Sequence, residues 1–145
     1  MTGAEDKIEL SGKCVCGAVG IHTLSASPHV GACHCNMCRQ WGGGAYMSVD
    51  CGTDVSFSGE ENIKVFSSST WAERGFCQGC GTHVFYRIKE TGQLMMAAGL
   101  FKEQDAFVNM DRQVFIDEKP AYYTFAEDTK NMTGAEVFAI YGPGG

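Results

Sequence analysis

The sequence predicts a mainly β protein, and three observations lead to that class. The apolar residues fall in short runs rich in Val, Ile, Phe and Tyr, which favour strands. Gly, Ser, Asn and Asp, which are typical of turns, separate these runs. Helical periodicity is scarce, and 145 residues are enough to bury a hydrophobic core within one domain.

The strands are expected in nine short segments, each an apolar run bounded by turn residues. They are predicted over residues 18–24, 45–49, 55–57, 64–66, 71–76, 83–88, 94–98, 113–116 and 137–141. Single helical turns are expected at 36–41 and 102–107. No repeat or linker marks a second domain, so we expect one domain over residues 8–142, with residues 1–7 and 143–145 as flexible ends.

The charge and composition exclude several classes of partner. Eleven Lys and Arg against 17 Asp and Glu give a net charge of −6, and the basic residues are scattered, so no nucleic acid is expected as a partner. No run approaches the roughly 20 apolar residues of a membrane span, and the N-terminus lacks the pattern of a secretory signal. We expect a cytoplasmic protein without a membrane partner. In that reducing compartment, clustered cysteines are more typical of metal ligands or redox groups than of disulfides.

Seven of the eight cysteines form three groups, in the segments KCVCG, ACHCNMCR and FCQGCGT. A structural zinc is closed by four ligands, and two groups of two supply four: Cys14, Cys16, Cys77 and Cys80. A glycine follows each pair and would let the backbone turn and aim N–H groups at sulfur. Cys33, Cys35 and Cys38 are then left as three ligands with a vacant position, which is typical of a catalytic zinc. A redox pair or buried thiols are the alternatives for the first set.

Two other residues are alternatives as a fourth ligand for the group of three. In an extended segment Cys33 and Cys35 share one face, a following turn brings Cys38 back, and His34 points to the other face. We expect His34 to be held by a backbone carbonyl. The isolated Cys51 is expected to be a small buried apolar residue.

With CxCGxV, CHCxxCR and FCxxCGT in that order, the chain resembles the glutathione-dependent formaldehyde-activating enzyme family, which includes centromere-protein-V-like domains. The resemblance covers roughly residues 10–125. It implies a tent-like arrangement of antiparallel sheets, with the set of four cysteines around a structural zinc and the set of three around a second zinc. The family commonly has a histidine and a tryptophan where this chain has Gln113 and Tyr122, departures that bear on the substrate.

The function follows from the chemistry of three thiolates. They more than cancel the charge of a zinc ion, so such a site acidifies water poorly and suits a soft fourth ligand, the sulfur of a thiol. Together with the resemblance, this predicts a carbon–sulfur lyase with two zinc ions, the second more labile, that forms or breaks a glutathione–aldehyde adduct of the S-hydroxymethylglutathione type. Its catalytic residues would be Cys33, Cys35 and Cys38.

The alternative is a zinc-stabilised, chaperone-like or protein-binding scaffold without catalysis. Iron on the same thiolates is a third possibility, and it predicts a coloured protein.

Three neighbouring residues have two interpretations each. Arg39 is the nearest cation in sequence for a glutathione carboxylate, or it is a solvated arginine at a helix end. Trp41, before three glycines, is a pocket wall or a core residue. His83 moves protons near the metals, or it makes a structural hydrogen bond.

Overall fold

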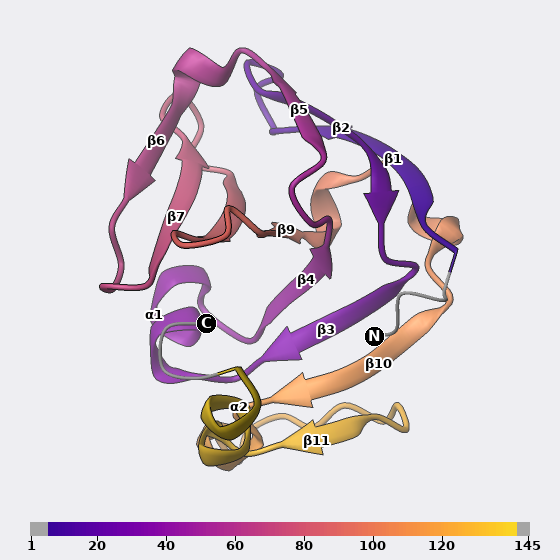
Figure 1. Cartoon of the computed structure of the whole chain (residues 1–145), viewed down its shortest axis with the longest axis vertical. Coiled ribbons are helices and arrows are strands. Elements are labelled where there is room, and N and C mark those ends of the chain that lie inside the picture. Colours follow the sequence, from indigo (N-terminus) through magenta and orange to yellow (C-terminus); the bar gives the residue numbers. More distant parts are fainter. Residues whose placement is uncertain (1–5, 142–145) are drawn as a thin grey trace.

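A computed structural model describes residues 6–141 and has two β-sheets (Figure 1). The smaller sheet is antiparallel, in the order β1-β2-β5, with β1 at Ile8–Lys13, β2 at Gly20–Ala26 and β5 at Val55–Ser58. The larger sheet has the order β11-β10-β3-β4-β9-β8-β7-β6. Its strands are β3 (His29–Cys33), β4 (Tyr46–Asp50), β6 (Ile63–Phe66), β7 (Ala72–Cys77), β8 (His83–Ile88), β9 (Leu94–Ala97), β10 (Asn109–Val114) and β11 (Lys130–Met132).

The mainly β class is confirmed, and helices are short. The helices are α1 (Asn36–Gly42) and α2 (Gly134–Tyr141), and 3-10 turns lie at Glu60–Asn62, Ala98–Leu100, Gln104–Ala106 and Ile116–Glu118. The expected helical turns at 36–41 and 102–107 correspond to α1 and to the turn at Gln104–Ala106. Within residues 6–141, no helix combines the length and the apolar character needed to cross a membrane.

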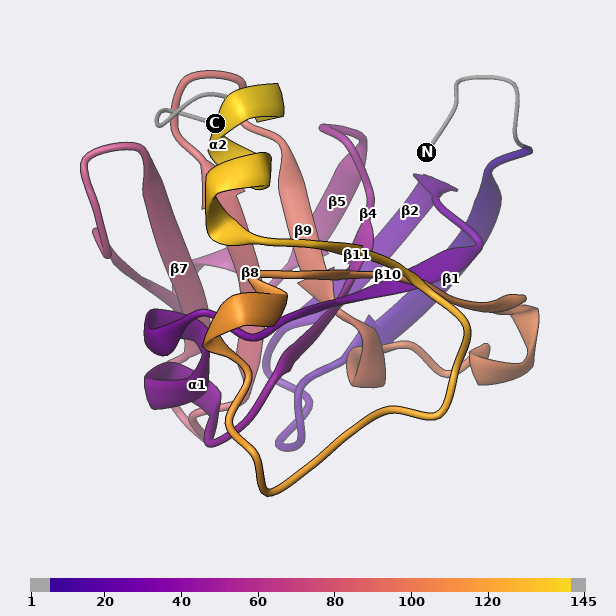
Figure 2. The same cartoon turned by 90° about the horizontal axis from the view of Figure 1, so that it is seen from below.

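The larger sheet is mixed. Strand β10 runs parallel to both β3 and β11, and the remaining strand pairs of the sheet are antiparallel. Figure 2 shows β10, β11 and β3 stacked side by side, with α2 after β11. The predicted strand at 113–116 overlaps only the end of β10, which begins at Asn109. Strands β1, β3 and β11 were not predicted. Of the expected flexible ends, residues 1–5 and 143–145 lie outside the described residues.

The strand predicted at 137–141 is wrong, since this segment belongs to helix α2. The helix begins with a capping box. Glu136 N–H donates to Thr133 Oγ1 at 3.1 Å, and Thr133 N–H donates to Glu136 Oε1 at 2.8 Å. These reciprocal bonds satisfy N–H groups that the first turn leaves unpaired, so they favour a helix over the strand that Val, Phe and Ile suggest.

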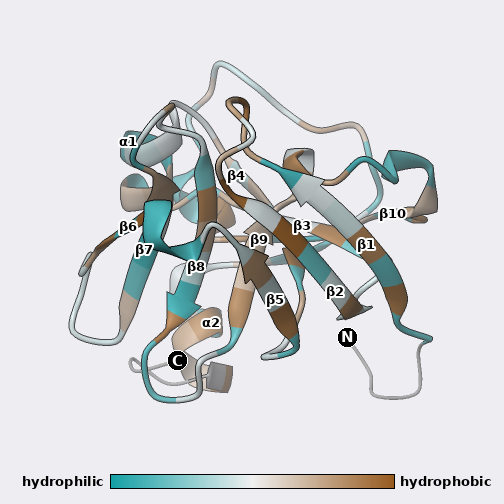
Figure 3. Cartoon of the chain, turned by 90° about the horizontal axis from the view of Figure 1, so that it is seen from above, coloured by the Kyte–Doolittle hydropathy of each residue, from teal (hydrophilic) through white to brown (hydrophobic). Residues whose placement is uncertain are grey.

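One hydrophobic core joins the two sheets. Leu10 and Ile21 contribute from the smaller sheet, and Val49, Phe85 and Met96 from the larger one; all five are buried. Burial alternates along β2, with Ile21 and Thr23 buried and His22 and Leu24 exposed, as expected for a strand with one face on the core; Figure 3 shows that hydrophobic residues of β2 lie on both faces. Cys14 and Cys77 belong to the same core, so the packing that joins the two sheets also supports the loops that carry these cysteines.

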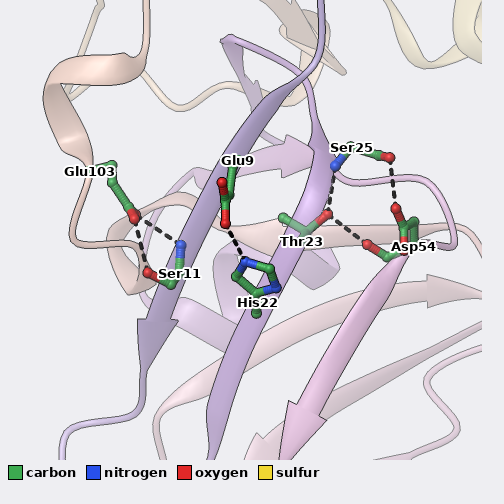
Figure 4. A network of polar contacts seen from close by, with 7 residues as sticks. All are labelled: Glu9, Ser11, His22, Thr23, Ser25, Asp54 and Glu103. Carbon is green, nitrogen blue, oxygen red and sulfur yellow. Dashed lines mark hydrogen bonds and ion pairs between the residues drawn. The ribbon is translucent and has the colours of Figure 1, made fainter.

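Polar contacts link the strands of the smaller sheet to one another and to neighbouring segments (Figure 4). Ser11 N–H and Ser11 Oγ donate to the two carboxylate oxygens of Glu103, each at 2.9 Å, which ties the segment after β9 to β1. Glu9 and His22 form a cross-strand pair at 2.7 Å. The buried Thr23 Oγ1 donates to the Asp54 carbonyl at 2.6 Å, which joins β2 to the loop before β5.

Candidate metal centres

Four cysteines from two loops converge at one end of β1 and β7, and we call them the quartet: Cys14, Cys16, Cys77 and Cys80. Their sulfur atoms lie within 4.8 Å of one another. The Sγ–Sγ distance is 3.6 Å between Cys14 and Cys16 and 3.7 Å between Cys16 and Cys77. Zinc–sulfur bonds of about 2.3 Å in a tetrahedron place sulfurs about 3.8 Å apart, so this donor set fits zinc closely.

Glycines shape both loops of the quartet. Gly17 and Gly81 have φ angles of +83° and +79°, in the left-handed region that side chains disfavour. Their N–H groups donate to the carbonyls of Cys14 and Cys77, at 3.1 and 2.8 Å, which closes each loop. Val19 N–H donates to Cys14 Sγ at 3.3 Å. The backbone therefore turns tightly after each cysteine pair, as the sequence indicated.

Thr82 links the two loops of the quartet. Its Oγ1 accepts the Val15 N–H at 3.1 Å and lies 3.1 Å from Cys80 Sγ. Hydrogen bonds from the Thr82 side chain and backbone lower the pKa of Cys80 to about 5. A cysteine that is already disposed to ionise is a ready thiolate ligand.

The remaining cysteines of the motif come together where β3 passes into α1, and we call them the trio: Cys33, Cys35 and Cys38. Cys33 ends β3, Cys35 caps α1, and Cys38 lies in its first turn. Cys35 Sγ accepts the Cys38 N–H at 3.4 Å. All three sulfurs lie within 4.8 Å of one another, and no further Cys, His, Asp or Glu of the described chain joins them. The trio thus offers three ligands and leaves one position open.

The three thiols of the trio cannot all ionise at neutral pH without a cation. Hydrogen bonds from Cys33 and Cys38 hold the pKa of Cys35 far below its usual value. The same contacts with Cys35 and Cys38, together with burial, raise the pKa of Cys33 far above it. Close contact among the three thiols thus favours the thiolate at Cys35 and disfavours it at Cys33, and a divalent cation would allow all three to ionise. The trio fits a thiophilic divalent ion.

Arg74, which the sequence analysis missed, contacts the trio from β7. Its guanidinium Nη1 and Nη2 donate to Cys38 Sγ at 3.6 and 3.5 Å. The same group lies over the rings of Trp41 and Tyr86, at 5.0 and 5.1 Å from their centroids. The residue is only 3% exposed. The sequence carried one signal of this burial: Arg74 lies two residues after Ala72 in a predicted strand, so both side chains lie on the same face, and Ala72 is buried.

His34 is fully buried, and both of its ring nitrogens are occupied. Gln113 Nε2 donates to Thr129, so Gln113 Oε1 accepts from His34 Nε2 at 2.8 Å. Tyr123 O–H donates to His34 Nδ1 at 2.6 Å. The expected backbone partner is therefore wrong, since two side chains hold the ring. With no free nitrogen, His34 does not complete the trio.

Cys51 also stays away from the trio. It is fully buried in the hydrophobic core and belongs to neither cysteine cluster. Burial raises the pKa of its thiol to about 12, so it remains a neutral apolar side chain. The position left open by the trio is thus not filled by either candidate that the sequence offered.

Arg39, Trp41 and His83, which flank the trio, each contact other residues of the protein. Arg39 Nε donates to the His34 carbonyl at 2.9 Å, so part of its guanidinium is committed to the backbone. Trp41 stacks on His83 with ring centroids 3.9 Å apart and an interplanar angle of 6°. Within residues 6–141, the ring of His83 is held by this stacking and not by the structural hydrogen bond that was one of its two interpretations. Burial and Arg74 lower its pKa, which favours the neutral ring.

The fold and its two clusters define a mainly β protein with one closed and one open candidate metal centre, both made of cysteine sulfur. The family model for the glutathione-dependent formaldehyde-activating enzyme matches residues 9–118. The chain belongs to this family, and the resemblance noted in its motifs is confirmed.

One curated relative supports this placement, and one solved structure shares the fold. An uncharacterized lyase of the fission yeast Schizosaccharomyces pombe is 35% identical over 130 residues, which cover 89% of this chain and 94% of the yeast protein. A crystal structure of a Rhodobacter sphaeroides protein has a TM-score of 0.55 and 23% identity, and the match covers 69% of this chain and 98% of that one. The second likeness supports the fold alone.

Proposed function

We propose that the protein makes and breaks a carbon–sulfur bond between a small thiol such as glutathione and a small aldehyde. In the forward direction the thiol sulfur adds to the aldehyde carbon, and the thiol proton ends on the aldehyde oxygen. The product is a hydroxyalkyl thioether such as S-hydroxymethylglutathione, and no oxidant or reductant is needed. The observation that carries the proposal is the open trio beside the closed quartet.

The trio would hold a zinc ion through Cys33, Cys35 and Cys38, and the quartet a second, structural one. When bound, the zinc at the trio supplies an open coordination position that suits a thiol sulfur and favours its thiolate form. The protein contributes rigidity, because Cys35 and Cys38 are fixed by the first turn of α1. The trio needs reduced thiols, which a reducing compartment such as the cytoplasm maintains.

Family membership and the yeast lyase support the same chemistry. The family description names glutathione and formaldehyde, and the yeast relative is called a lyase, the class that breaks such bonds without water or redox change. Gln113, where the family commonly has a histidine, contacts the ring of His34, which lies between Cys33 and Cys35 in the chain, and at this departure we expect any change in the accepted aldehyde or thiol to arise.

Elemental analysis of the Cys35→Ser variant tests the proposal. We expect about two zinc ions per chain in the wild type and about one in the variant, with loss of glutathione binding and of adduct formation from glutathione and formaldehyde. Cys51→Ala is the matched control, since it removes a thiol outside both clusters and should keep both zinc ions.

If Cys35→Ser retains glutathione binding and turnover, the proposal is wrong. A wild-type protein with a single zinc that does not respond to glutathione would favour the scaffold function instead.

A further inference from the structure

Arg74 is a buried cation without a carboxylate partner in the described chain. Its side chain forms no salt bridge there, and its Nε–H lacks any hydrogen-bond acceptor. By contrast, Arg87 on the neighbouring strand pairs with Glu73, with 2.8 Å between Arg87 Nε and Glu73 Oε2. A guanidinium that is 3% exposed needs a counter-charge, and among the described residues the ionisable group that its N–H groups contact is the thiol of Cys38, a member of the trio.

We infer that Arg74 is a positioning residue that sets the net charge of the trio and thereby selects a thiolate over a neutral molecule as its fourth ligand. The inference rests on the proposed function, because it concerns the same open position. It adds the residue that makes an anionic ligand acceptable there.

Charge balance gives the first step. Three thiolates around a divalent ion carry a net charge of −1, and a fourth thiolate makes it −2. In a partly buried site each added negative charge repels the next. Arg74 lowers the magnitude of both values by one, so the site accepts the fourth thiolate at a net charge of −1.

The geometry of the guanidinium gives the second step. Nη1 and Nη2 both point at Cys38 Sγ, so two charge-assisted hydrogen bonds draw electron density from one ligand sulfur. That sulfur then donates less to a bound metal, which leaves the metal better able to accept another thiolate. The rings of Trp41 and Tyr86 hold the guanidinium in place through cation–π contacts.

The experiment compares two ligands of different charge. Protein with cobalt(II) in the labile site is titrated at one fixed pH with 2-mercaptoethanol, which binds as a thiolate, and separately with imidazole, which binds as a neutral ligand. Only the open site responds, because the quartet has no free position. The visible spectrum of cobalt(II) reports binding, so no turnover is needed.

For Arg74→Met we expect affinity for 2-mercaptoethanol to fall roughly ten- to a hundredfold, the size of a charge-assisted hydrogen bond, with imidazole affinity almost unchanged. Arg87→Met is the matched control, an arginine of the same sheet that contacts Glu73 and no cysteine, and should change neither affinity. A purely structural role for Arg74 would weaken both ligands together.

Arg74→Lys keeps the charge but loses the two-pronged contact. It should retain most of the preference for thiolate, and it tests the inference even if Arg74→Met does not fold. Wild-type thiolate affinity in Arg74→Met, or loss of the preference in Arg74→Lys, overturns the inference. If the wild type itself does not bind 2-mercaptoethanol, the proposed function fails and the inference fails with it; unchanged thiol binding in Arg74→Met defeats the inference alone.

Discussion

Replacing a quartet cysteine should destabilise the zinc-loaded protein more than replacing a trio cysteine. A metal bridge stabilises a fold partly by closing a loop in the unfolded chain, with an entropy that grows as the logarithm of loop length. Cys16 and Cys77 are 61 residues apart, whereas Cys33 and Cys38 are separated by five. The difference, (3/2)RT ln(61/5), is about 2 kcal/mol.

We therefore expect Cys16→Ser to lower the free energy of unfolding by at least about 2 kcal/mol more than Cys35→Ser. The four-ligand site should also bind its metal more tightly, which acts in the same direction. Cys16 is exposed, so its replacement sacrifices little packing. For a domain of this size the difference corresponds to about 4–8 °C in melting temperature, measured by calorimetry on the zinc-loaded proteins.

A double variant makes the test sharper. Cys16→Ser and Cys80→Ser would each abolish the same site, so the double variant should be little less stable than either single one. Equal losses in Cys16→Ser and Cys35→Ser, or additive losses in the double variant, would refute a shared metal at the quartet.

Two further predictions concern polar side-chain contacts. Tyr123→Phe leaves Nδ1 of the buried His34 without its donor and should cost about 1–3 kcal/mol in urea unfolding, whereas Tyr122→Phe, at a residue that is 76% exposed, should cost almost nothing. Hydrogen bonds from the backbone and side chain of Ser11 lower the pKa of Glu103. The ionised carboxylate therefore stabilises the fold above the pKa of Glu103 in the unfolded chain, and this stabilisation is lost as the pH falls through the pKa of Glu103 in the folded protein. Glu103→Gln should therefore reduce the loss of stability between pH 7 and pH 3; an unchanged loss would contradict the assignment.

Much of the strand pattern could be predicted because local alternation decides it. Segments such as β8 and β9 have apolar, β-branched or aromatic residues between turn signals, and they were expected within a residue of their ends. Strand β11 could not be found this way, because KNM has almost no apolar content and is held by its parallel pairing with β10. Helix α2 was missed because its apolar residues suggested a strand, although the capping-box spacing from Thr133 to Glu136 was visible.

The cysteine grouping could be read from spacing because a metal site needs a fixed number of ligands. The surroundings of the trio could not be read in that way. His34 is held by Gln113 and Tyr123, which lie 79 and 89 residues away in sequence. No local sequence pattern indicates those partners. Arg74 is 36 residues from Cys38, and its contact depends on how β7 packs beside α1.

Strand β7 connects the two candidate centres. Cys77 of the quartet ends the strand, and Arg74, three residues earlier, reaches Cys38 of the trio. The quartet fixes the end of β7 against the loop after β1, so it also fixes the position from which Arg74 extends. A small shift of that strand would move a buried charge away from its counter-charge, which is costly in a site of low polarity. A metal bound at the quartet would therefore stabilise the geometry proposed for the trio, and strand β7 would couple the two sites.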